Sequence, residues 1–247
     1  MADIGRADAA HSEAIEKFAM QVAMLRSLRT SLSRSSALGG GHRCFSSGGE
    51  PPIVDSFDPN RGFMRSWRAW SESTLAIVNL RQRLPDWGVP TFRGEASELY
   101  RQVSLALAAA DVKRLKKLTT PSCYALLADS IKRRPAGQRH AWEAKEVAAS
   151  VKQVRLAHNA KDPERQYAQV TCSIAAKLVW VIEDAAGVKV GGLGTEEAPY
   201  TTDDYWVFER LLPPASPAPS VPLGEEGVWR IKSRLVVDGA GADAASK

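Results

Sequence analysis

The spacing of apolar residues changes near residue 138, and this change is the strongest constraint on the fold. Before it, apolar side chains recur every three or four residues, as in Ala96, Leu99 and Val103, which is the spacing of one helix face. After the Pro-Ala-Gly turn at 135–137, valines and aromatic residues fill short alternating runs instead. Helices followed by strands predict an α+β fold, with the N-terminal helices packed on one face of an antiparallel sheet.

Four such runs predict a four-stranded sheet, at 142–159, 165–184, 200–212 and 227–237. The segments that join the last three runs are polar and rich in glycine or proline, which predicts loops at 185–199 and 213–227. In the last run we expect Trp229, Ile231 and Leu235 on the buried face and Lys232 on the opposite face, because alternate residues of a strand point to opposite sides.

A separate amphipathic helix is predicted from about Gly62 to Leu84, where Pro85 ends it. One face carries its large apolar residues and one threonine: Phe63, Trp67, Trp70, Thr74, Ile77 and Val78. Arginines lie on the other side. A cationic helix with two tryptophans suits a membrane surface or RNA, and the residues predicted to make such a contact are Trp67, Trp70, Arg65 and Arg68. The same stripe is equally compatible with an arm that packs on the domain.

The first 45 residues have the composition of a mitochondrial targeting segment. From Met24 to Gly49 the chain has four arginines, many serines and no acid. The run RCFSSGG is similar to a plant-type processing site, so we expect cleavage after Phe45. A disordered basic tail has a similar composition. Four acids precede Met24 and oppose import, which favours a translation start at Met24. The remaining expected parts are a linker with the helical arm, the α+β domain and a disordered tail, at 46–91, 92–237 and 238–247.

The sequence lacks the usual catalytic signatures, since it contains no HExxH, GxSxG or GxxxxGK[ST]. The histidines are scattered and the three cysteines form no CxxC pair, so we expect no metal site and no disulfide framework. Cys123 and Cys172 are expected to be buried. Asp203 and Asp204 are neighbours on a predicted strand, so they point to opposite faces and cannot form a catalytic dyad. We therefore expect no enzyme activity, no cofactor and no small-molecule substrate.

Positive charge gathers in one part of the chain. Residues 92–182 contain sixteen Lys and Arg against eight Asp and Glu, whereas residues 183–247 contain six against eleven. Two basic clusters near predicted helix ends contribute most: Lys113, Arg114, Lys116 and Lys117, then Lys132, Arg133, Arg134 and Arg139. Such clusters can bind RNA phosphates in a salt-sensitive, sequence-independent way. The alternative is a solvated helical surface with cations near a helix C-terminus.

The last two predicted strands resemble a known family. DDYWVFERLL followed by GVWRIKSRLVV resembles the final hairpin of the mitochondrial large-ribosomal-subunit protein forty-five family. The matching positions are Val207, Phe208, Glu209, Arg210, Trp229, Arg230, Ile231, Arg234 and Leu235. RQYAQVTCSIAAKLVWVIED is similar to that family's second strand, and ASELYRQVSLALAAADVKRLKKLTT to its opening helix and basic turn. The resemblance spans 92–237, and the proline-rich insertion at 213–222 departs from the family pattern.

This resemblance implies a structural component of the mitochondrial large ribosomal subunit near the polypeptide exit tunnel. The implied partners are ribosomal RNA, neighbouring large-subunit proteins and the mitochondrial inner membrane or its insertase, and the implied location is the matrix, peripheral to that membrane. The wider superfamily includes the import-motor scaffold of the inner-membrane translocase, which is the alternative function. A scaffold of that kind is expected to carry a long charged chaperone-binding region, but only about 45 residues separate Phe45 from the domain.

An enzyme that uses a cavity between helices and sheet is the second alternative. It requires polar, ionisable residues that converge on the inner face of the sheet. The inner face predicted for the last strand is mostly apolar, which disfavours this alternative.

Overall fold

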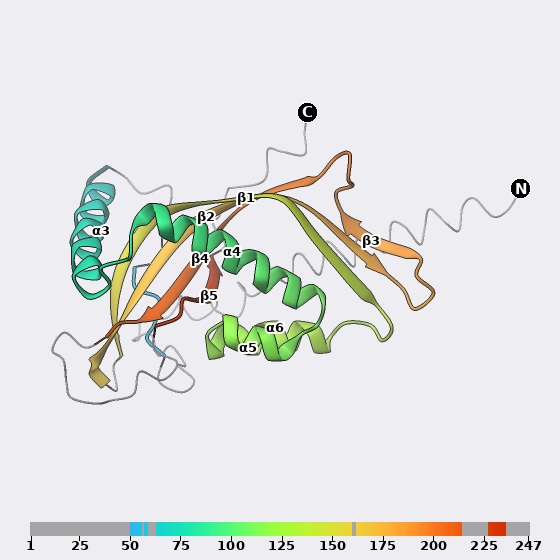
Figure 1. Cartoon of the computed structure of the whole chain (residues 1–247), viewed down its shortest axis with the longest axis horizontal. Helices are drawn as coiled ribbons and strands as arrows, with labels where there is room; N and C mark the ends of the chain where they lie inside the picture. The colour runs from blue at the N-terminus through green and yellow to red at the C-terminus, as the bar shows by residue number, and fades with distance from the viewer. Residues whose placement is uncertain (1–49, 56, 59–62, 160–161, 214–226, 236–247) are drawn as a thin grey trace, which may run out of the picture.

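A computed structural model describes residues 50–55, 57–58, 63–159, 162–213 and 227–235 (Figure 1). The described residues form four helices, α3 (Phe63–Arg83), α4 (Val89–Ala108), α5 (Val112–Leu118) and α6 (Pro121–Lys132). They also form five strands, β1 (Arg139–Asn159), β2 (Asp162–Glu183), β3 (Lys189–Leu193), β4 (Tyr200–Leu211) and β5 (Arg230–Leu235). This order confirms the predicted α+β fold. The predicted targeting segment 1–45, its start at Met24 and the tail 238–247 lie outside the described residues.

The helices begin where the sequence carries start signals. Pro90 lies in the first turn of α4 and Pro121 in that of α6. In the first turn a backbone N–H has no hydrogen-bond partner within the helix, so proline, which lacks this N–H, fits there. Asp111 caps α5, because its carboxylate accepts a hydrogen bond from the Arg114 backbone N–H. α4 and α5 are therefore two separate helices joined by a short capped turn, and not one helix with a kink.

The strands form one antiparallel sheet in the order β1-β2-β4-β5, and β3 pairs with the end of β2. Its register places four apolar residues in a row across one face: Val154 opposite Val170, then Phe208, then Ile231. All four are buried. This row marks the face that the helices cover.

The sheet has five strands among the described residues, which corrects the predicted four. β3 lies inside the predicted loop 185–199 because the loop begins with a tight turn. The Asp184 carboxylate accepts hydrogen bonds from the backbone N–H groups of Ala186 and Val188, and Gly187 adopts a positive φ of 79°. The chain thus folds back as a hairpin, although its glycines weaken the strand signal.

The core lies between the sheet and helices α4, α5 and α6, which Figure 1 shows on the same side of the sheet. Phe92 of α4 packs against Phe208 and Trp229, with ring centroids 5.7 and 4.5 Å apart. Farther along α4, Tyr100 packs edge-on against Trp142 and Trp206. Each such aromatic pair contributes about 0.5–1.5 kcal/mol beyond its buried area. The helices therefore cover one face of the sheet, as predicted.

Helix α3 lies at the outer edge of the sheet, beside β1 (Figure 1). Its second half is anchored by Ala76 and Leu80, which are buried in the core. The Ser73 hydroxyl accepts a hydrogen bond from the Val154 backbone N–H at 3.4 Å. The helix thus satisfies part of a strand edge that would otherwise be open to pairing with another chain.

The opposite face of the sheet is also covered, so Lys232 lies on the predicted face but is buried there. Trp229 and Ile231 are buried as predicted, whereas Leu235 is half-buried and, beyond a β-bulge, pairs with Tyr205 on the face opposite to the Ile231–Phe208 pair. Lys232 is buried as well, next to a β-bulge where the β4–β5 register shifts between Val207 and Phe208. Alternation along β5 predicts the face of each residue but cannot show that residues 50–55 cover the second face.

Candidate interaction surfaces

Helix α5 presents a basic surface to solvent. Leu115 is fully buried and fixes one side of the helix against the core. The four cations predicted to contact RNA are all exposed on the remaining sides: Lys113, Arg114, Lys116 and Lys117. These four cations repel one another at short range. The repulsion is offset in part because Lys116 and Lys117 occupy the final turn, where the helix dipole favours positive charge.

The basic residues at the end of α6 are not equivalent to one another. Lys132, Arg133 and Arg139 are exposed, and Arg133 forms an ion pair with Asp129 one turn earlier. Arg134 is half-buried and donates hydrogen bonds to the backbone carbonyls of Leu107 and Ala108, at 2.7 and 3.1 Å. Burial lowers the pKa of its guanidinium. Arg134 thus bonds to two carbonyls in the last turn of α4, although the Leu107 carbonyl also accepts from the Ala110 backbone N–H.

These contacts bring the two basic clusters to the C-terminal end of α4. α5 begins at Val112, shortly after α4 ends at Ala108, and Arg134 ties the end of α6 to the same helix terminus. The negative end of the α4 dipole lies there, so cations around it are electrostatically favoured. We call the exposed residues Lys113, Arg114, Lys116, Lys117, Lys132, Arg133 and Arg139 the basic surface.

The tryptophans predicted to make a membrane or ribosome contact are exposed. Trp67 and Trp70 are 62% and 61% exposed, with ring centroids 5.4 Å apart. Leu75 and Val78 on the same helix are also exposed. Arg68 pairs with Glu72 at 2.8 Å, and the side chain of Arg65 lies outside the described residues. α3 therefore packs on the domain through Ala76 and Leu80, which lie outside the predicted apolar stripe, and the two tryptophans of that stripe stay exposed.

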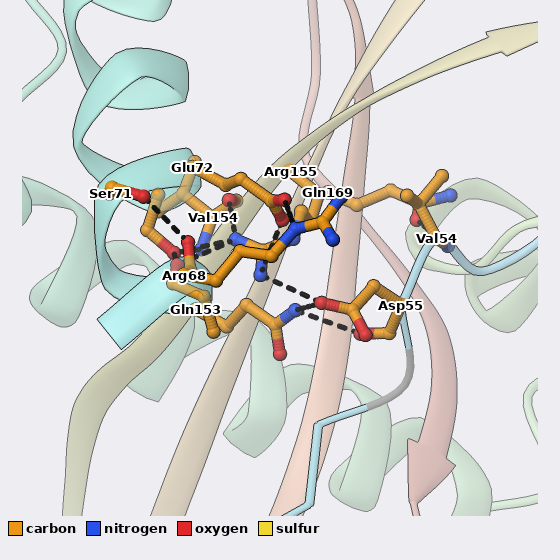
Figure 2. A network of polar contacts seen from close by, with 11 residues as sticks. Val54, Asp55, Arg68, Ser71, Glu72, Gln153, Val154, Arg155 and Gln169 are labelled. Atoms are coloured by element: carbon orange, nitrogen blue, oxygen red, sulfur yellow. Dashed lines mark hydrogen bonds and ion pairs between the residues drawn. The ribbon is translucent and has the colours of Figure 1, made fainter. Parts of the chain in front are cut away.

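A polar network that the sequence did not predict joins α3 and residues 50–55 to the sheet. Its centre is Arg155 of β1, whose side chain is only 6% exposed. Figure 2 shows its guanidinium between the carboxylates of Asp55 and Glu72, at 2.8 and 3.4 Å. The same group donates to the Ser73 hydroxyl and to the Ala69 carbonyl. A single buried cation thus holds two segments that are distant from it in sequence.

A second buried network lies at the other end of residues 50–55. Lys232 of β5 is 2.8 Å from Glu209 of β4 and 3.5 Å from Glu50. Glu50 also accepts hydrogen bonds from the Ser122 backbone N–H and hydroxyl, and so caps α6 in place of the Thr120 side chain. Burial raises the pKa of Glu209, and Lys232 beside it acts in the opposite direction.

The candidate catalytic and redox groups are held in structural contacts. Asp203 accepts a hydrogen bond from Ser173, whereas Asp204 pairs with Arg234, so the two carboxylates face opposite sides as predicted. Burial raises the pKa of both Cys123 and Cys172 to about 12, which keeps these thiols protonated and unreactive. Within the described residues, no three His, Cys, Asp or Glu side chains group as metal ligands, and no helix is long and apolar enough to cross a membrane.

Comparisons with known proteins are consistent with a binding or scaffold role. No curated protein matches the chain. The family model of the Tim44-like domain matches residues 73–231, from the middle of α3 to β5 and well over half of the 247 residues. This domain is a scaffold or binding domain rather than a catalytic one, and it associates with membranes and with protein or ribosome partners. The chain therefore belongs to the Tim44-like domain family.

Proposed function

We propose that this protein is a structural component of the mitochondrial large ribosomal subunit, where it binds ribosomal RNA near the polypeptide exit tunnel and helps hold the ribosome at the inner membrane. In this proposal residues 1–45 direct import and are removed, residues 46–91 form a linker and helical arm, and residues 92–237 form the RNA-binding domain. Its partners are ribosomal RNA and adjacent large-subunit proteins. It works in the matrix, peripheral to the inner membrane.

The observation that carries this proposal is the basic surface at the end of α4. It combines seven exposed cations from α5, α6 and the start of β1, and among the described residues only Arg133 of these forms an ion pair. Removing the predicted leader leaves 27 basic and 24 acidic residues, so the protein as a whole is only weakly cationic. RNA affinity would therefore depend on this local surface, because phosphate binding follows local rather than net charge.

The exposed face of α3 supports the proposed second contact. Trp67 and Trp70 lie on a helix that is anchored to the domain by Ala76, Leu80 and the Arg155 network. Tryptophan rings are favoured at membrane interfaces because they combine an apolar body with a polar N–H group. The helix can therefore present both rings to the inner membrane, or to its insertase, without leaving the domain.

The import-motor scaffold of the inner-membrane translocase is the alternative function. The Tim44-like domain is common to this scaffold and to the ribosomal family, and the match at residues 73–231 fits both. In this alternative the basic surface binds acidic protein or lipid partners instead of RNA. The two functions differ in the complex that the protein joins.

RNA binding can be tested with two charge-reversal variants of the full chain. The first variant, Lys116→Glu with Lys117→Glu, reverses the charge of two residues of the basic surface. The second variant, Lys152→Glu with Lys189→Glu, is a matched control, because these two lysines are also exposed but lie on β1 and β3. The ligand is transcribed large-subunit ribosomal RNA, titrated between 50 and 200 mM salt. We expect the first variant to bind the RNA at least about tenfold more weakly. The slope of log binding constant against log salt concentration should become shallower by about 1.5, since each phosphate contact contributes about 0.7–0.9 to that slope.

The control variant is expected to bind within about twofold of the wild type. Equal weakening by both variants would show that RNA binding follows net charge rather than the basic surface. Unchanged binding by the first variant would contradict the proposal.

A further inference from the structure

Residues 50–55, which we call the strap, cross the face of the sheet that the helices leave open. Glu50 contacts β5 and the start of α6, the Pro52 carbonyl and the Val54 N–H both bond to the Gln169 side chain of β2, and Asp55 bonds to β1. The strap thus spans all four main strands of the sheet within six residues.

The sheet surface beneath the strap is polar. Most buried side chains of this face are polar, those of Gln153, Arg155, Gln169, Thr171, Ser173, Glu209 and Lys232, and the apolar exceptions include Val207 and, in the strap itself, Pro51. An apolar face would strongly favour its cover, because exposing apolar surface to water is unfavourable in proportion to its area. A polar face instead regains hydrogen bonds from water when it is uncovered. The composition of this face therefore lowers the free energy needed to remove the strap.

The strap is held by two ion clusters of the same composition. Each contains one buried cation of the sheet, one carboxylate of the strap and a second carboxylate from elsewhere. In the first cluster Lys232 lies between Glu50 and Glu209, and in the second Arg155 lies between Asp55 and Glu72. We call these the Lys232 clasp and the Arg155 clasp.

The second carboxylate changes what happens when the strap leaves. Removing the partner of a buried charge is strongly unfavourable, because the remaining charge is left uncompensated. Here Lys232 keeps Glu209 at 2.8 Å, and Arg155 keeps Glu72 at 3.4 Å. Gln169 likewise keeps its hydrogen bond to Glu209 when it loses Pro52. Neither cation is orphaned when the strap is absent.

We propose that the strap is a releasable cover, which detaches from the polar face of the sheet while the domain and α3 remain folded. Detachment exposes the polar face, whose two cation–carboxylate pairs stay assembled. α3 stays on β1 because its contacts with Arg155, Val154 and the core do not involve the strap. This conformational switch goes beyond the proposed function and does not depend on RNA binding.

Amide hydrogen exchange of the wild-type chain, resolved by residue with NMR, tests the switch. The Val54 N–H is bonded to Gln169 and the Ser122 N–H to Glu50, so both report strap contacts. The Val154 N–H is bonded to Ser73 and therefore reports the contact between α3 and β1. We expect Val54 and Ser122 to be at least about 100-fold less protected than the amides of the β2–β4 ladder, because local opening precedes global unfolding. Equal protection of all these amides would overturn the proposal.

Two isosteric variants distinguish a releasable cover from an ordinary structural contact. Glu50→Gln weakens the strap side of the Lys232 clasp, and we expect Ser122 to exchange about tenfold faster. Glu209→Gln removes the carboxylate that compensates Lys232 after release, so opening becomes harder and we expect Ser122 to exchange about tenfold more slowly. Val154 should stay within about twofold in Glu50→Gln. Faster exchange of Ser122 in both variants would overturn the role given to Glu209.

Discussion

Arg155 shows how one residue can fix two segments that the chain brings from far away. It lies 100 residues after Asp55 and more than 80 after Ala69 and Ser73, yet it bonds to all three. Its Nε is buried without a hydrogen-bond partner, so the side chain is held by its terminal nitrogens alone. The guanidinium fork suits this task, because its fixed geometry offers several donors at once.

Replacing Arg155 should therefore destabilise the protein. We expect Arg155→Met to lower the free energy of unfolding by about 2–3 kcal/mol, less than a fully buried pair would lose, because Asp55 and Glu72 are each about 40% exposed and remain partly hydrated. Urea unfolding followed by tryptophan fluorescence measures this change. Arg68→Met is the matched control, since Arg68 pairs with the same Glu72 but is 84% exposed. Similar unfolding midpoints for the two variants would contradict the central role of Arg155.

At the residue scale, the charge of a side chain is easier to predict from the sequence than the surroundings of that side chain. The exposed cations of α5 and the buried cysteines were predicted from local pattern. Lys232 and Arg155 were not identified as buried ions, because strand alternation places them on the outer face and cannot show what covers that face. Arg134 was grouped with the RNA-binding residues, whereas its contacts with the end of α4 depend on tertiary structure.

At the element scale, β3 depends on one glycine more than on any strand-forming residue. Gly192 has a φ of +150°, and a Cβ placed there would lie 2.2 Å from the carbonyl oxygen of Trp180 on β2. A side chain would have to push the two backbones apart. Gly191, its neighbour, has room for a Cβ, whose closest atoms are 3.8 Å away on the Ile182 side chain.

We therefore expect Gly192→Ala to disrupt the β2–β3 pairing. The loss should be about 1–3 kcal/mol of unfolding free energy, because the strained backbone and the clash add together. Thermal unfolding and proteolysis between residues 184 and 199 measure it. Gly191→Ala is the control and should behave like the wild type. Equal effects of the two substitutions would show that β3 tolerates a change of backbone spacing.

Helices α4 and α6 and strands β1, β2, β4 and β5 were predictable, because their apolar periods and turn signals are local. β3 and the strap were not, and for related reasons. Both segments are rich in glycine, proline and polar residues, which usually indicate loops. β3 forms because a tight turn returns it to β2, and the strap is held by side chains of distant strands. Neither cause is visible in the local sequence.

At the scale of the whole molecule, the binding features lie on separate parts of one domain. The basic surface lies at the end of α4, the tryptophans lie on α3 beside the β1 edge, and the strap covers the far face of the sheet. A protein arranged in this way can contact RNA and a membrane or insertase at the same time, because the two surfaces do not share residues. This separation fits a scaffold that joins two large partners.

The most far-reaching proposal is that the protein is a component of the mitochondrial large ribosomal subunit. Its most direct test is sedimentation of detergent-solubilised mitochondria at low and high salt, with the protein located by antibody across the gradient. We predict that at low salt the wild type sediments with the large subunit, and that the Lys116→Glu, Lys117→Glu variant leaves it at lower salt than the wild type, because phosphate contacts weaken as salt rises. Sedimentation with the translocase, or as a free protein at low salt, would contradict the account.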